Sequence, residues 1–268
     1  MTSLFDSALE CLLECEPSRK CEAVHSLYNQ WLEGEVVLDE NPQPVAVETP
    51  GRPARPELVH PRDLPKRSLG TTEGRAALIH AIAHIEFNAI NLALDAMVRF
   101  PHMPRDYHAD WLRVAAEEAG HFRLLSARLA ELGYAYGDYP AHNGLWDMAL
   151  RTAGSVLDRM ALVPRLMEAR GLDVTPGMIR NFRKLGDMQT VAILEIILEE
   201  EIGHVEAGTR WFRYLCDEQD VEPENTYFNR LAHYLGNDIH CPVHYKARLD
   251  AGFTSSELHR LERLCSRK

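Results

Sequence analysis

Two near-copies of one pentapeptide constrain this chain more than any other feature. Residues 117–121 read Glu-Glu-Ala-Gly-His, and residues 200–204 read Glu-Glu-Ile-Gly-His. Each copy contains Glu-x-x-His, which on a helix places the carboxylate and the imidazole on one face, about one turn apart. One such pair arises often by chance. Two copies inside apolar helical segments indicate a shared role.

A further carboxylate precedes each copy at almost the same distance. Glu86 lies 32 residues before Glu118, and Glu168 lies 33 residues before Glu201. One Glu from each of two helices and Glu-x-x-His from each of two others is a set that can hold two metal ions inside a helix bundle. The predicted metal ligands are Glu86, Glu118, His121, Glu168, Glu201 and His204.

The surroundings of these carboxylates argue against a solvated helix face. Glu86 lies between Ile85 and Phe87, and Glu201 shares its helix face with Ile197. A buried, unpaired carboxylate costs several kcal/mol or takes up a proton, and four of them together would repel. Two divalent cations would offset the four charges, so we predict metal binding over a merely hydrogen-bonded polar core.

The types of ligand favour particular metals. Carboxylates with one imidazole per ion suit iron or manganese, and no thiolate is present to favour zinc or copper(I). We therefore expect two metal ions, with iron first and manganese or a mixed Mn/Fe pair as the alternatives. Two-metal sites have a spacing of about 3.5–4 Å, so carboxylates should bridge the ions.

The pattern resembles the ferritin-like superfamily of di-iron carboxylate proteins. That resemblance implies that the glutamates of the two Glu-x-x-His pairs, Glu118 and Glu201, bridge the ions. Each lone glutamate then completes one ion with a histidine: Glu86 with His121, and Glu168 with His204.

Four residues are candidates for contacts just outside the ligands: Glu117, Glu200, His84 and Arg165. In ferritin-like proteins the carboxylate before the bridging Glu often orients the opposite ligand histidine, which implies this role for Glu117 and Glu200. The alternative for both is a solvated helix face. His84 is otherwise a satisfied core histidine, and Arg165 is otherwise part of an ordinary helix salt bridge rather than a partner of Glu168 or of an anionic substrate.

Three longer blocks resemble the DUF455 family. They read His-Ala-Ile-Ala-His-Ile-Glu-Phe at 80–87, Leu-Val-Pro-Arg-Leu-Met-Glu-Ala-Arg-Gly-Leu-Asp-Val-Thr-Pro-Gly at 162–177, and Glu-Ile-Gly-His-Val-Glu-Ala-Gly-Thr-Arg-Trp-Phe at 201–212. The resemblance covers roughly residues 70–255. It implies a ferritin-like fold and the metal site, and it implies no substrate.

The hydrophobic periodicity predicts an all-α fold, an antiparallel four-helix bundle with a crossover connection, and the resemblance implies that this bundle is ferritin-like. Thr71 or Thr72 should cap the first long helix, Pro164 should kink the third, and Gly171 should end it. The long helices are expected at 72–99, 104–132, 145–170 (in one or two pieces) and 187–219, and Pro176 and Gly177 should mark a new start after Gly171.

Three regions follow from this pattern. Residues 1–70 should form two short helices, at 3–15 and 19–33, and a proline-rich extended arm that packs on the core. Residues 71–220 should form the bundle with the dimetal site. Residues 221–268 should form a C-terminal helical extension with a loop around Pro242 and a last helix near 254–265, opened by Thr254 or Ser255.

Net charge and cysteine content indicate which partners and which cell compartment to expect. The net charge of −11 argues against nucleic-acid and anionic-membrane partners, and no signal peptide or run of 18 apolar residues is visible. None of the six cysteines forms Cys-x-x-Cys, so the cluster Cys11, Cys15 and Cys21 is expected to hold ordinary reduced thiols. We expect a soluble, cytoplasmic protein.

The expected activity is that of a di-iron oxidoreductase of the monooxygenase or oxidase type. It would activate O₂ to oxidise an unknown organic substrate, a small molecule or a modified base, with electrons from an external donor. The alternative is an iron-handling or peroxide-scavenging protein like ferritin or rubrerythrin, and a tRNA-binding modification enzyme is a third class. Leu125 stands where ribonucleotide-reductase radical subunits carry a tyrosine, which weakens a radical-storage role.

Overall fold

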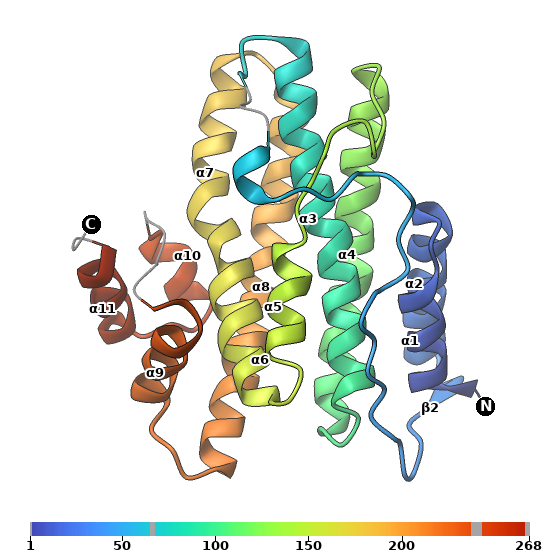
Figure 1. The fold of residues 1–268 in the computed structure, drawn as a ribbon, viewed down its shortest axis with the longest axis vertical. Coiled ribbons are helices and arrows are strands. Elements are labelled where there is room, and N and C mark those ends of the chain that lie inside the picture. Colours follow the sequence, from blue (N-terminus) through green and yellow to red (C-terminus); the bar gives the residue numbers. More distant parts are fainter. Residues whose placement is uncertain (1, 65–67, 237–242, 266–268) are drawn as a thin grey trace. The chain divides into compact units, whose positions relative to one another are not determined.

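The computed structural model describes residues 2–64, 68–236 and 243–265, and within them the fold is all-α, consistent with a helical bundle (Figure 1). The chain forms two compact units, Met1–Leu150 and Arg151–Lys268, and each is described by itself. The division into regions 1–70, 71–220 and 221–268 stays a prediction.

Unit 1 is built on a pair of long helices, α3 and α4, which lie side by side (Figure 1). Helix α1 packs on α3, and α2 packs on α4 and on α1. Strands β1 and β2 form one short parallel pair. The elements of this unit are β1 (Thr2–Ser3), α1 (Leu4–Leu13), α2 (Pro17–Leu32), β2 (Val36–Val37), the 3₁₀ turn η1 (Pro61–Asp63), α3 (Thr72–Arg99), α4 (Arg105–Glu131) and α5 (Gly144–Arg151), which ends at the boundary.

Helix α3 is the most deeply buried element of unit 1. It begins where expected, because the Thr71 Oγ1 accepts a hydrogen bond from the Gly74 backbone N–H at 3.0 Å. Its length and composition would suffice to cross a membrane, but most of it is buried inside the structure. This is the behaviour of a core helix and is consistent with a soluble protein.

The proline-rich segment 38–60 lies on unit 1 as an extended arm with almost no regular structure. The Val45 backbone N–H donates to the carbonyl oxygen of Val98 at 2.9 Å, and Arg99 Nη2 donates to the carbonyl oxygen of Val47 at 2.8 Å. Backbone groups that cannot enter a helix are thus satisfied at the C-terminal end of α3.

Unit 2 contains one long rod made of three consecutive segments, α6, η2 and α7, and the long helix α8 packs along it (Figure 1). Helix α9 packs on α6 and α8, and α10 packs on α7, α8 and α11. The elements are α6 (Val156–Leu162), the π-helical segment η2 (Val163–Glu168), α7 (Ala169–Lys184), α8 (Met188–Glu218), α9 (Pro223–Leu235), α10 (Tyr245–Asp250) and α11 (Ser255–Cys265).

Helix was predicted over 145–170 in one or two pieces, and the structure has two, α5 and the rod that begins with α6. The predicted end at Gly171 is wrong, because the rod spans residues 156–184 and passes through both Gly171 and Pro176. A glycine inside a helix costs only about 1 kcal/mol, and the burial of neighbouring apolar residues such as Leu172 outweighs it. Pro164 does distort the rod, because it lies within the π-helical segment η2.

The C-terminal region is helical, and α11 is opened by Thr254 as expected. The Thr254 Oγ1 accepts from the Glu257 backbone N–H at 3.1 Å, and the Glu257 carboxylate accepts from the Thr254 backbone N–H at 2.8 Å. Helix α10 was not anticipated. The predicted loop around Pro242 falls largely on 237–242, outside the described residues.

Four cysteines carry free thiols: Cys11, Cys15, Cys21 and Cys216. The expectation of reduced thiols in the N-terminal cluster is therefore confirmed. Burial raises the pKa of Cys11 to about 11, which makes that thiol a poor nucleophile at neutral pH. Cys265 is disulfide-bonded, which the sequence had not suggested.

Candidate metal centre

Three predicted ligands meet between α3 and α4 in unit 1. Glu86 projects from α3, and Glu118 and His121 project from α4; all three are buried. The Nδ1 atom of His121 lies 3.2 Å from a carboxylate oxygen of Glu86 and 3.2 Å from one of Glu118. These residues, the first triad, can each offer a ligand atom, with all such atoms within 4.8 Å of one another. The first triad is a buried cluster that could hold a metal ion.

Small residues surround the first triad on both helices. Ala83 lies about one turn before Glu86 on α3, and Ala115 lies about one turn before Glu118 on α4; both alanines are completely buried. Short side chains at these positions let two helices approach closely, and this keeps the carboxylates of one helix within reach of the other. The alanine spacing thus helps to place the ligands.

The first triad attracts positive charge. Burial and the neighbouring Glu118 carboxylate raise the pKa of Glu86 well above its ordinary value, although the hydrogen bond with His121 opposes this. Burial would lower the pKa of His121, but its hydrogen bonds with Glu118 and Glu86 outweigh burial and raise that pKa to about 12. A cation at this point would relieve the repulsion between the two carboxylates.

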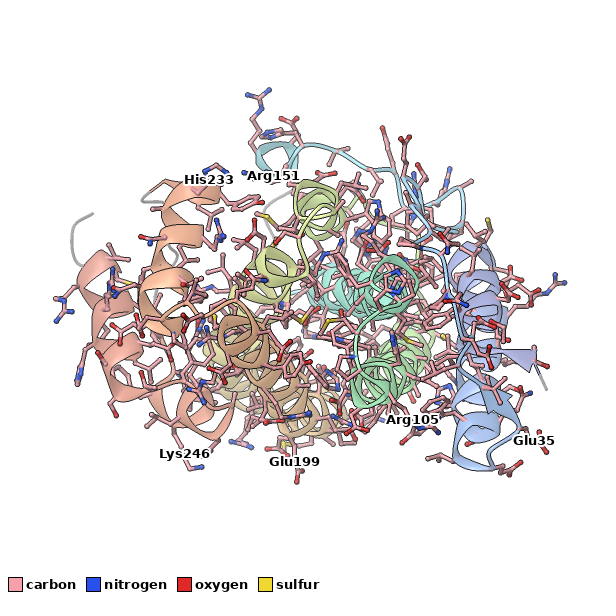
Figure 2. All side chains as sticks on the ribbon, turned by 90° about the horizontal axis from the view of Figure 1, so that it is seen from below. Glu35, Arg105, Arg151, Glu199, His233 and Lys246 are labelled. Atoms are coloured by element: carbon pink, nitrogen blue, oxygen red, sulfur yellow. The ribbon has the colours of Figure 1, made fainter. Side chains whose placement is uncertain are left out.

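Unit 2 holds the other predicted ligands, the second triad: Glu168, Glu201 and His204. All three are buried. Glu201 and His204 share one face of α8, with His204 Nδ1 3.8 Å from a carboxylate oxygen of Glu201. Glu199, only two positions before Glu201, is exposed at the outer surface of α8 (Figure 2). Glu199 is exposed whereas Glu201 and His204 are buried, so the Glu-x-x-His pair lies on the buried face of α8.

Glu168 reaches its place through the π-helical segment η2. Pro164, near the start of η2, packs directly on Gly208 of α8, where an added Cβ would lie 2.4 Å from the Pro164 Cβ. Gly208 follows His204 by four residues and therefore lies on the same face of α8. The segment η2 packs against α8, and Glu168 is buried on it. Single π turns of this kind are frequent at functional sites.

The structure thus brings together Glu86, Glu118 and His121 in unit 1, and it pairs Glu201 with His204 in unit 2. Glu168 is buried on the segment that packs against α8. The assignment of all six residues to one dinuclear ligand set stays a prediction.

The two predicted orienting carboxylates are not equally explained. Glu117 is half-buried and forms an ion pair with Arg113 on its own helix, with Nη1 to oxygen distances of 3.0 and 2.8 Å. Glu200 is half-buried on α8. The orienting role of Glu117 and Glu200 stays a prediction.

His84 and Arg165 form hydrogen bonds with residues other than the six predicted ligands. His84 Nδ1 lies 2.9 Å from the Tyr136 hydroxyl oxygen, and its Nε2 lies 3.1 Å from the carbonyl oxygen of His142. Burial lowers the pKa of His84 to about 4, so the ring is neutral. This favours a satisfied core histidine. Arg165 pairs with Glu257 at 2.6 Å rather than with Glu168.

Two features of the site were not anticipated. The π geometry of η2 follows from no local pattern, although Pro164 lies four residues before the predicted ligand Glu168. The contact of Arg165 with Glu257 has no sequence signal either, because 92 residues separate the partners.

Unit 1 also contains a cavity of about 930 Å³ at the N-terminal end of α2. Its lining includes Phe122 and Tyr136, whose rings meet edge to face at a centroid distance of 4.9 Å. The Phe122 ring also contacts that of Phe87 at 5.3 Å. Phe122 and Phe87 directly follow His121 and Glu86 in the chain, but consecutive side chains on a helix point in different directions, and none of the first triad lines the cavity.

Comparison with known proteins gives a family without a stated activity. Residues 13–259 match the family described as "Protein of unknown function (DUF455)". A curated relative from Haemophilus influenzae (strain ATCC 51907 / DSM 11121 / KW20 / Rd), described as "Uncharacterized protein", is 42% identical over 268 residues, which cover 96% of this chain and 93% of the relative. No solved structure matches the chain.

Proposed function

Since the chain belongs to the DUF455 family, we propose its function from the site: a ferritin-like, dinuclear metal protein that activates O₂ to oxidise or hydroxylate an organic substrate. One observation carries the proposal. Each unit buries a Glu-x-x-His pair on a long helix and a further glutamate on the element packed against it.

The donor set fits two divalent ions. Four carboxylates carry four negative charges, two divalent cations carry four positive charges, and neutral imidazoles complete the set. The raised pKa values of Glu86 and His121 support the fit, because they mark a buried point where negative charge needs a cation or a proton. Iron is the proposed metal, and manganese has the same ligand preferences.

In this proposal the first triad and the second triad together would hold the two metal ions, and each triad would supply two carboxylates and one imidazole. When bound in its reduced state, a pair of iron ions supplies two electrons to O₂. The chain contributes rigid helices that hold the ligands and an apolar surrounding that excludes water.

The cavity of unit 1 favours an organic substrate over iron storage. Its lining combines two aromatic rings, Phe122 and Tyr136, with charged residues such as Glu16 and Arg123, so it could hold a small molecule that carries both apolar and polar groups. The electrons would come from a separate donor protein, and the substrate would be a small molecule or a modified base.

The test is an anaerobic loading with Fe(II) followed by exposure to O₂. We expect about two ferric ions per chain in each cycle and no further accumulation. Storage of many ferric ions per chain would identify an iron-handling protein instead, and rapid consumption of hydrogen peroxide in preference to O₂ would identify a scavenger.

A further inference from the structure

Arg165 is a completely buried guanidinium within η2, three residues before Glu168. Its Cζ atom lies 4.3–4.6 Å from the centroids of three aromatic rings, and all three belong to unit 2. A charge in such a place needs fixed partners, because desolvation is costly. The three rings are those of Phe212, Tyr227 and Phe253.

The partners of Arg165 come from three other helices. Its Nη2 donates to Glu257 Oε1 of α11 at 2.6 Å, and its Nε donates to the Thr209 hydroxyl oxygen of α8 at 3.3 Å. The Tyr227 hydroxyl of α9 donates to the carbonyl oxygen of Arg165 at 3.1 Å. Both the side chain and the main chain at this position are therefore held from outside the rod.

Glu257 is itself immobilised. It is buried, and its second carboxylate oxygen accepts from the Thr254 backbone N–H at 2.8 Å, at the start of α11. A carboxylate fixed by its own helix cannot follow its partner if the partner moves. The Arg165–Glu257 ion pair is thus a firm anchor point for η2.

We propose that Arg165 and Glu257 act as a positioning pair, which anchors η2 to the C-terminal helices and thereby fixes Glu168 where it can ligate a metal ion. A π segment has wider turns and poorer packing than an α-helix, so its geometry depends on contacts from outside. Arg165 lies on that segment less than one turn before the ligand. Helices α9–α11 then control Glu168 without contacting the ion. This inference rests on the proposed function.

Arg248 offers a matched control for Arg165. It is also buried, its Cζ lies 5.0 Å from the Phe253 ring centroid, and it forms a two-point ion pair with Asp173 at 2.9 and 2.7 Å. It belongs to α10, however, and holds α7 rather than η2. Arg165→Lys and Arg248→Lys therefore damage similar buried pairs, and only the first damages the anchor of η2.

The experiment titrates each full-length, metal-free variant with Co(II), whose visible absorption reports the ligands of each ion. We expect both variants to melt at a lower temperature without metal. Only Arg165→Lys should weaken the binding of one of the two ions by about 10-fold to 100-fold and alter the absorption of that ion. Equal Co(II) affinities and spectra in the two variants would overturn the inference and leave a structural ion pair.

A milder variant covers the case in which Arg165→Lys does not fold. Thr209→Val removes one acceptor of the Arg165 guanidinium and keeps the side-chain shape. We expect it to weaken the binding of the same ion by about 10-fold and to lower the melting temperature of the metal-free protein less than Arg165→Lys does, because only one buried donor loses its acceptor; an unchanged affinity would overturn the inference. If the wild-type chain binds no Co(II), Fe(II) or Mn(II), the proposed function fails and this inference fails with it.

Discussion

Gly208→Ala tests whether the close contact between η2 and α8 places the second triad. An added Cβ would lie 2.4 Å from the Cβ and 2.5 Å from the Cγ of Pro164. Carbon atoms in contact prefer about 3.5–4.0 Å, so the gap is short by roughly 1 Å. The proline ring is fixed to its own backbone and cannot rotate away, so η2 or α8 must shift.

Two opposing effects set the size of the change in stability. Overpacking a core costs about 1–3 kcal/mol, whereas replacing glycine by alanine inside a helix contributes about 1 kcal/mol of stabilisation. Gly171→Ala separates the two, because nothing lies within 4 Å of an added Cβ at Gly171 in α7. We expect Gly208→Ala to be less stable than Gly171→Ala by about 1–3 kcal/mol.

Urea unfolding of the two metal-free variants measures this difference, and a metal titration measures its consequence. Displacement of η2 should weaken binding at the second triad in Gly208→Ala and leave it unchanged in Gly171→Ala. If both variants gain the same stability and bind metal equally, the contact between Pro164 and Gly208 does not position Glu168.

Two further predictions concern unit 1. Burial lowers the pKa of Lys20 to about 7, so above pH 7 the unfolded chain binds more protons than the folded chain and the free energy of unfolding rises with pH. Lys20→Met should remove about 2 kcal/mol of that rise between about pH 7 and pH 8.5, as measured by urea unfolding. The same dependence of the free energy of unfolding on pH in both proteins would contradict this. Asp95→Ala leaves the Arg99 guanidinium buried beside the arm without its 2.7 Å ion-pair partner, so we expect a loss of about 3–5 kcal/mol and faster proteolysis within segment 38–60. Unchanged cleavage there would show that the arm is held by other contacts.

The sequence predicts the first triad well because its signal is local. Glu118 and His121 lie one helical turn apart on one chain segment, and Glu86 lies in an apolar run whose period predicts a core helix. The start of α3 follows from Thr71, which caps the helix as predicted. Here local propensity, capping and burial all agree.

The sequence predicts the second triad less completely because its geometry is set over long distances. Gly171 and Pro176 suggested a break in the rod, but tertiary packing carries the helix through both of them. The π segment depends on the contact of Pro164 with Gly208, and no local pattern pairs these positions. Arg165 was expected near the ligands by its place in the chain, but its partner, Glu257, comes from the last helix.

The metal content of the wild-type chain and of two variants tests the central claim most directly. After anaerobic loading with Fe(II) and removal of free metal, elemental analysis of the wild-type chain should give about two ions per chain. Glu118→Ala in unit 1 and Glu201→Ala in unit 2 should each lose metal, and Glu199→Ala, at an exposed position of α8, should not. Two retained ions in either of the first two variants, or none in the wild-type chain, would contradict a shared dinuclear centre.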